Sequence, residues 1–168
     1  MSLFEATQQA EVPTQVRRVL HVPAGGGKAT WLSGDVYSVK AGAADTGGSI
    51  AVLEASVPPG GGPPPHRHAD EDEAFYVLDG RLTIRVGENT YEAATGDFVF
   101  VPRGTAHQFH NHSLHSAKLL LIFTPGGVEN FFLEAGTAPT AGMPVPVEDP
   151  PGVAEVGARH GVIPASFD

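Results

Sequence analysis

Short alternating apolar segments, separated at close intervals by glycine and proline, most restrict what this chain can fold into. Residues 49–57 read SIAVLEASV, an alternating segment rich in β-branched residues, and the loop PPGGGPPP follows at once. The 168-residue chain contains 21 Gly and 15 Pro. Such spacing suits many short strands joined by turns, and it interrupts long helices. The sequence therefore predicts an all-β domain.

Strand-like segments recur along most of the chain. Asp79-Gly80 lies between two of them and is a strong hairpin signal, whereas the proline-rich loop at 58–65 is excluded from a central strand. Repeated short strands of this kind are typical of a β-sandwich or barrel. The predicted strands are Arg17–Val22, Val36–Lys40, Ser49–Val57, Glu73–Leu78, Arg81–Val86, Thr90–Ala93, Asp97–Val101, Ala106–His110 and Lys118–Thr124.

The length fits one domain. We expect an N-terminal arm at 1–16, a β-barrel domain at 17–136 and a proline-rich C-terminal extension at 137–168. Residues 125–136 are expected to include a short helix with Val128, Phe131 and Phe132 on one face. A second short helix is expected at Val153–His160 within the extension.

Charge and cysteine content exclude several functions. The chain has no cysteine, so disulfides, thiolate metal sites and cysteine nucleophiles are excluded. A formal net charge of −9 would repel nucleic acids and anionic membranes. The longest apolar run, Leu119–Phe123, is too short to span a bilayer, and the N-terminus has no secretory signal pattern. We therefore expect a cytoplasmic protein whose partner is a small molecule.

Four residues have the composition of a metal site. His66 and His68 project to one face if they lie in a strand, Glu73 opens the next strand, and His107 lies further along. Three imidazoles and one carboxylate suit a divalent first-row metal such as Fe, Mn, Ni, Co, Cu or Zn. Taken singly, these residues are more often ordinary surface side chains, and only their joint spacing favours a metal site.

That spacing forms two motifs. The first is G-x5-H-x-H-x4-E-x6-G over residues 60–80, and the second is G-x5-P-x-G-x2-H-x3-N over residues 96–111. Together they resemble the cupin superfamily, which implies a small double-stranded β-helix, or jelly-roll barrel. The resemblance further implies that one divalent ion, with Fe, Mn, Ni or Co favoured and Zn or Cu possible, is held by His66, His68, Glu73 and His107.

Longer phrases are most similar to the bacterial, single-domain quercetin 2,3-dioxygenase-like group. They include DEAFYVLDGRLTIRVG, GDFVFVPRGTAHQF and LLLIFTPGGVENFF. This resemblance implies a homodimer that opens a ring of a flavonol, or a related enolisable aromatic, with O₂. Glu73 would be both metal ligand and catalytic base. Two alternatives stay open, because fold does not fix function: a non-oxidative isomerase, cyclase or lyase, and a binding protein without catalysis.

An aromatic substrate requires an apolar slot. By strand alternation Phe75 follows Glu73 inward and Phe109 follows His107, so both are predicted to contact substrate, although both could equally fill the core. Trp31, Tyr37, Phe131 and Phe132 are candidates for the mouth of the site. His110, His112 and His115 are expected at the surface rather than in a second metal site.

Overall fold

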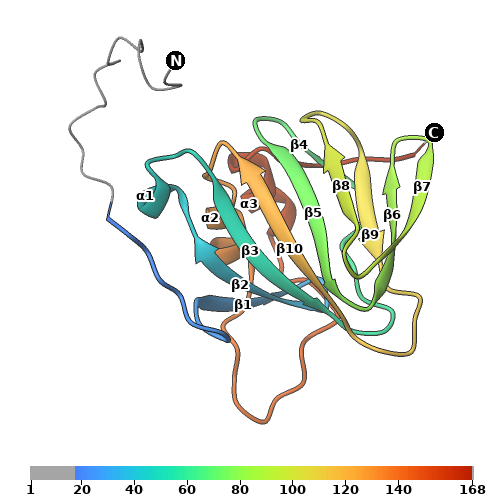
Figure 1. Ribbon diagram of the computed structural model, residues 1–168, viewed down its shortest axis with the longest axis horizontal. Helices are drawn as coiled ribbons and strands as arrows, with labels where there is room; N and C mark the ends of the chain where they lie inside the picture. Colours follow the sequence, from blue (N-terminus) through green and yellow to red (C-terminus); the bar gives the residue numbers. More distant parts are fainter. Residues whose placement is uncertain (1–17, 168) are drawn as a thin grey trace, which may run out of the picture.

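A computed structural model describes residues 18–167, which form two antiparallel sheets that face each other (Figure 1). One sheet has the strand order β1 (Lys28–Leu32), β2 (Asp35–Ala41), β3 (Ala51–Val57), β10 (Ala117–Thr124), β5 (Asp72–Asp79) and β8 (Phe98–Val101). The other has the order β11 (Val162–Pro164), β4 (His66–His68), β9 (His107–His110), β6 (Arg81–Val86) and β7 (Asn89–Ala94). The predicted all-β jelly-roll is confirmed.

The core lies between the sheets, where strand alternation directs the apolar side chains. In β3 every second residue is buried, and Leu53 pairs with Leu121 of β10, which in turn pairs with Phe75 of β5. Ile84 and Phe109 face them from the second sheet. Each such side chain stabilises the folded state by about 1.5–3 kcal/mol through burial.

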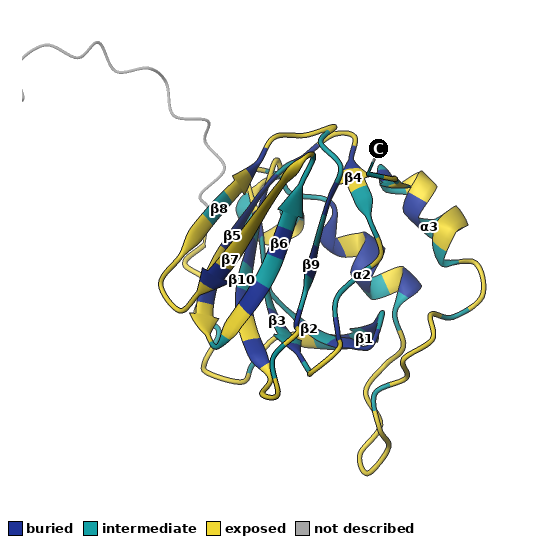
Figure 2. Cartoon of the chain, turned by 90° about the vertical axis from the view of Figure 1, so that its right-hand side faces the viewer, coloured by how far each residue is buried: buried dark blue, intermediate teal, exposed yellow. Residues whose placement is uncertain are grey.

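Two helices close one side of the barrel. Contacts run from β1 to α2 (Glu129–Ala135), from α2 to α3 (Val153–Arg159), and from α3 to β11. Helix α2 buries Phe131 and Phe132, and α3 lies outside it (Figure 2). The short α1 (Ala43–Thr46) connects β2 to β3. Both longer helices were predicted, with somewhat wider bounds.

Some expectations differ from the structure. The predicted strand at Arg17–Val22 is wrong, because residues 18–22 are not in a strand. Strands β1, β4 and β11 were not among the predicted strands, although the spacing of His66 and His68 was considered for a strand. The expected arm at 1–16 lies outside the described residues. Within residues 18–167, no helix is both long enough and apolar enough to cross a membrane.

Candidate metal centre and adjoining cavity

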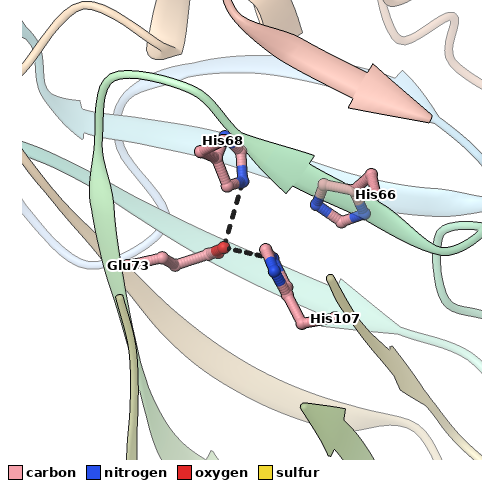
Figure 3. Close-up of side chains that lie close together, drawn as sticks. All are labelled: His66, His68, Glu73 and His107. Carbon is pink, nitrogen blue, oxygen red and sulfur yellow. Dashed lines mark hydrogen bonds and ion pairs between the residues drawn. The ribbon is translucent and has the colours of Figure 1, made fainter. Parts of the chain in front are cut away.

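Three strands bring the four motif residues together. His66 and His68 lie on β4, Glu73 on β5 and His107 on β9, with His66 directly paired to His107. One ligand atom from each residue lies within 4.8 Å of the others (Figure 3). Glu73 Oε2 is 2.8 Å from His107 Nε2 and 3.1 Å from His68 Nε2. The carboxylate thus comes from one sheet and the imidazoles from the other.

Backbone carbonyls orient two of the imidazoles. His66 Nδ1 is 3.0 Å from the carbonyl oxygen of Pro64, and His107 Nδ1 is 2.9 Å from that of Thr105. Because a carbonyl only accepts, each Nδ1 carries the proton, and a neutral ring then presents the lone pair of Nε2. A second nitrogen fixed in this way is the usual arrangement for a metal-ligating histidine.

The donor set fits a cation. With Nδ1–H directed at Thr105, a neutral His107 would turn its Nε2 lone pair toward Glu73 Oε2 only 2.8 Å away. That approach is repulsive unless a proton or a metal ion lies between the two atoms. His68 is buried, and neither of its ring nitrogens has a hydrogen-bond partner. Adjacent ligands about 2.1 Å from one ion lie about 3 Å apart, as Glu73 Oε2 does from His107 Nε2 and from His68 Nε2.

The electrostatics keep the carboxylate charged and one imidazole neutral. Burial alone would raise the pKa of Glu73, but the hydrogen bond from His107 and the adjacent His68 ring hold it well below its usual range. Burial, with repulsion from His107 and His68, lowers the pKa of His66 to about 3. Burial opposes protonation of His107 too, yet the hydrogen bond to Glu73 raises the pKa of that ring. The cluster therefore attracts positive charge at the point where Glu73 meets the imidazoles.

A cavity of about 490 Å³ adjoins the cluster, which is within the usual size of small-molecule sites. His66, His68 and Glu73 line it, together with the predicted Phe109. Phe75 does not line it. Instead, the Phe75 ring packs behind the site, with its centroid 6.0 Å from that of His107 and 5.8 Å from that of Phe109.

Of the four aromatic residues proposed for the mouth of the site, three line the cavity and one does not. Tyr37, Phe131 and Phe132 line the cavity, and the Tyr37 and Phe132 ring centroids are 4.7 Å apart. Trp31 does not line it; its backbone pairs with Thr137 beside α2.

Sequence reasoning missed much of the cavity wall. Ten of the 23 lining residues belong to positions 149–165, including Val153 and Ala154 of α3. The short apolar helix predicted there was the only signal, and it did not indicate which surface the helix would cover.

The remaining motif residues lie apart from the centre. His110 and His112 lie outside the four-residue cluster, with ring centroids 4.2 Å apart and ring planes tilted by 55°. Asn111 is buried, and its Nδ2 donates to the carbonyl oxygens of Val57 and His115. Its side chain thus ties the end of β9 to β3.

Comparisons with known proteins agree with this architecture. The family model described as "Cupin domain" matches residues 53–123. Quercetin 2,3-dioxygenase of Bacillus subtilis is 31% identical over 106 residues, which are 62% of this chain and 31% of that protein. The chain spans between 31% and 60% of the length of the curated relatives that it matches.

Solved structures share the fold at low sequence identity. The polyketide cyclase RemF from Streptomyces resistomycificus is 19% identical with a TM-score of 0.59, over 90% of this chain and 88% of that one. KdgF from a Halomonas species is 15% identical with a TM-score of 0.59, over 67% of this chain and 98% of that one. Residues 53–123, which match the family model, hold His66, His68, Glu73 and His107 on strands β4, β5 and β9, and this part of the chain is a cupin domain.

Proposed function

We propose that this chain is a metal-dependent dioxygenase that opens a ring of a flavonol, or of a related aromatic enol, with O₂. The observation that carries the proposal is a three-histidine, one-glutamate cluster of which His66, His68 and Glu73 line a mostly apolar cavity with aromatic walls. The similarity to a quercetin 2,3-dioxygenase supports the same substrate class. One divalent ion, of which Fe, Mn, Ni and Co are the first to test, would be the cofactor.

The cavity chemistry favours an uncharged aromatic substrate. Phe109, Phe131 and Phe132 offer flat apolar surfaces, and no Lys or Arg of the described chain lines the cavity. A carboxylate or phosphate on a part of the substrate remote from the ion would lose its hydration there without gaining a cationic side chain as partner. A planar phenol would bury its rings against these side chains.

His66, His68, Glu73 and His107 would hold the ion. When bound, such an ion supplies Lewis acidity toward a substrate hydroxyl and redox chemistry toward O₂. Glu73 would accept the proton of that hydroxyl. Its Oε2 faces the imidazoles, while its Oε1 makes no hydrogen bond to any described residue. The three phenylalanines would orient the ring system and exclude water from it.

Oxygen uptake with quercetin tests the proposal. Protein loaded separately with Fe, Mn, Ni or Co should consume O₂ and release carbon monoxide with at least one metal. Samples without substrate, and the His66→Ala variant, should not. Anaerobic conversion of quercetin, or no uptake with any metal at confirmed occupancy, would overturn the oxidative function.

Glu73→Gln separates the proposed base from the metal ligand. The amide keeps an oxygen toward the ion but cannot take a proton, so kcat should fall by about 10²–10⁴. Metal content, measured by mass spectrometry, should fall far less than in His66→Ala. Glu88→Gln changes an exposed carboxylate in the same manner and should leave kcat unchanged. Equal kcat in the Glu73 and Glu88 variants would remove Glu73 from proton transfer.

A further inference from the structure

The segment 149–165 forms a wall of the cavity outside the residues that match the family model. Helix α3 contributes Val153, Ala154, Glu155 and Gly157 to this wall. Strand β11 continues it with Val162 and Pro164. Figure 2 shows α3 and β4 on the same side of the barrel. Most of the wall is therefore apolar and backbone-rich.

Strand pairing fixes this wall to the metal centre. Val162 pairs with His68, and Pro164 pairs with His66, so β11 runs beside the strand that carries two of the proposed ligands. The pairing of β4 with β9 on its other edge is confined to His66 and His107. Gly157 lies against β11, since a Cβ at this position would be 2.7 Å from the carbonyl oxygen of Val162.

Polar contacts hold both ends of the wall. The backbone N–H of Ser33 donates to Asp149 Oδ1 over 2.7 Å, and the Ser33 hydroxyl donates to the same carboxylate. Glu134 of α2 accepts from Arg159, and Glu134 Oε2 is 2.8 Å from His160 Nε2. The wall is thus attached to the barrel before α3 and after it.

The charges that this wall brings to the cavity are all negative. Asp149 and Glu155 are among the lining residues, and Asp149 is already engaged by Ser33. No described Lys or Arg lines the cavity beside these two carboxylates, and the positive charge expected there is that of the ion that Glu73 and the histidines would hold. Both side chains are exposed, so an anionic ligand entering past α3 would meet like charge whose repulsion is strongest at low ionic strength.

We propose that residues 149–165 determine substrate specificity: their apolar surface admits flat uncharged ligands, and Glu155 with Asp149 rejects ligands that bear a carboxylate or phosphate. This inference rests on the proposed function for the location of the substrate site. Residues 149–165 would thus select the substrate, whereas His66, His68, Glu73 and His107 would hold the ion.

Calorimetric titration of the metal-loaded protein with 2-naphthol and 2-naphthoate tests whether the carboxylates of the wall reject an anionic ligand. The probes have the same ring system and differ in one charged group. Wild-type protein should bind 2-naphthol at least tenfold more tightly. Glu155→Lys should reduce that ratio at least threefold, whereas Glu148→Lys makes the same charge change outside the cavity lining and should leave it unaltered. Equal shifts in both variants, or wild-type binding of neither probe, would overturn the inference.

Two alanines of α3 test whether the shape of the cavity wall determines binding. Ala154 lines the cavity, whereas Ala158 lies on the same helix and does not. Ala154→Trp should weaken 2-naphthol binding at least tenfold, and Ala158→Trp should leave it within twofold of wild type. Equal affinities would overturn the assignment of α3 as a specificity wall. Failure of O₂ uptake with intact probe selectivity would instead refute only the proposed dioxygenase activity.

Discussion

Asp35, a buried residue of β2, makes folding stability depend on pH. Its Oδ2 accepts a hydrogen bond from the Tyr37 hydroxyl over 3.1 Å, while Oδ1 has no hydrogen-bond partner. Burial raises the pKa of Asp35 from 3.8 to about 7, against the lowering effect of the Tyr37 hydrogen bond. The folded state therefore binds this proton more tightly than the unfolded state. Its stabilising contribution is complete below pH 3.8 and is lost as the pH rises toward 7.

Asp35→Asn should remove this dependence. Relative to the variant, the wild-type protein should lose about 2–3 kcal/mol of unfolding free energy between pH 5 and pH 8. Urea denaturation at several pH values measures the difference. Asp79 is exposed in the hairpin before Gly80, so the unfolding free energy of Asp79→Asn should change with pH as that of the wild type does. If the unfolding free energy of Asp35→Asn also changed with pH as that of the wild type does, Asp35 would not titrate between pH 5 and pH 8.

At the scale of single residues, the sequence predicted which four residues come together better than it predicted the cavity wall. His66, His68, Glu73 and His107 could be found because their spacing is written in two local motifs. Strand alternation correctly predicted that Phe75 points inward. It could not show whether an inward side chain lines the cavity or packs in the layer behind the cavity. Both environments are buried and apolar, so only the positions of neighbouring strands separate them.

Helix α3 provides a test at the scale of elements. Alanine usually stabilises a helix interior by about 1 kcal/mol relative to glycine. At Gly157, however, an added Cβ would lie 2.7 Å from the carbonyl oxygen of Val162. Such overpacking costs about 1–3 kcal/mol, so Gly157→Ala should lower the melting temperature despite its better helix propensity. An increase would show that α3 moves freely against β11.

Ala158→Gly supplies the matched comparison. It removes a methyl group from an exposed position of the same helix, so it should cost only the helix-propensity term of about 1 kcal/mol. Circular dichroism melting curves of both variants measure the two effects. A Gly157→Ala variant with unchanged 2-naphthol affinity would separate the stability of α3 from its role in the cavity wall.

Strands that follow from local pattern were predicted, and strands that depend on a distant partner were not. β3 and β10 have long apolar alternation. β11 has three residues, and its partner β4 lies far away in the sequence. Residues 18–22 have a similar apolar pattern to the predicted strands but no strand to pair with, so they remain outside the sheets.

At the scale of the whole molecule, a bound ion would join the two sheets. Glu73 belongs to the six-stranded sheet, and the three histidines belong to the five-stranded one. An ion bound only by the folded state, at 100 times its Kd, adds about 2.7 kcal/mol to stability. Chelation should therefore lower the melting temperature by about 5–10 °C in a protein of this size.

Differential scanning calorimetry with and without EDTA measures this shift. His107→Ala should abolish the response to EDTA because it removes a proposed ligand. His110→Ala alters another histidine of β9, outside the cluster, and should keep the response. An unchanged wild-type melting temperature after confirmed metal removal would contradict a contribution of the ion to stability.

The pairing of β11 with β4 has a consequence for biosynthesis. Val162 is translated 94 residues after His68, with which it pairs. Before β11 has been synthesised, β4 pairs with β9 through His66 and His107, and its His68 carbonyl accepts from the Gly104 N–H, but its other edge has no strand. A nascent chain therefore presents its histidines before β4 has both of its strand partners, so an ion would be bound firmly only after β11 has paired.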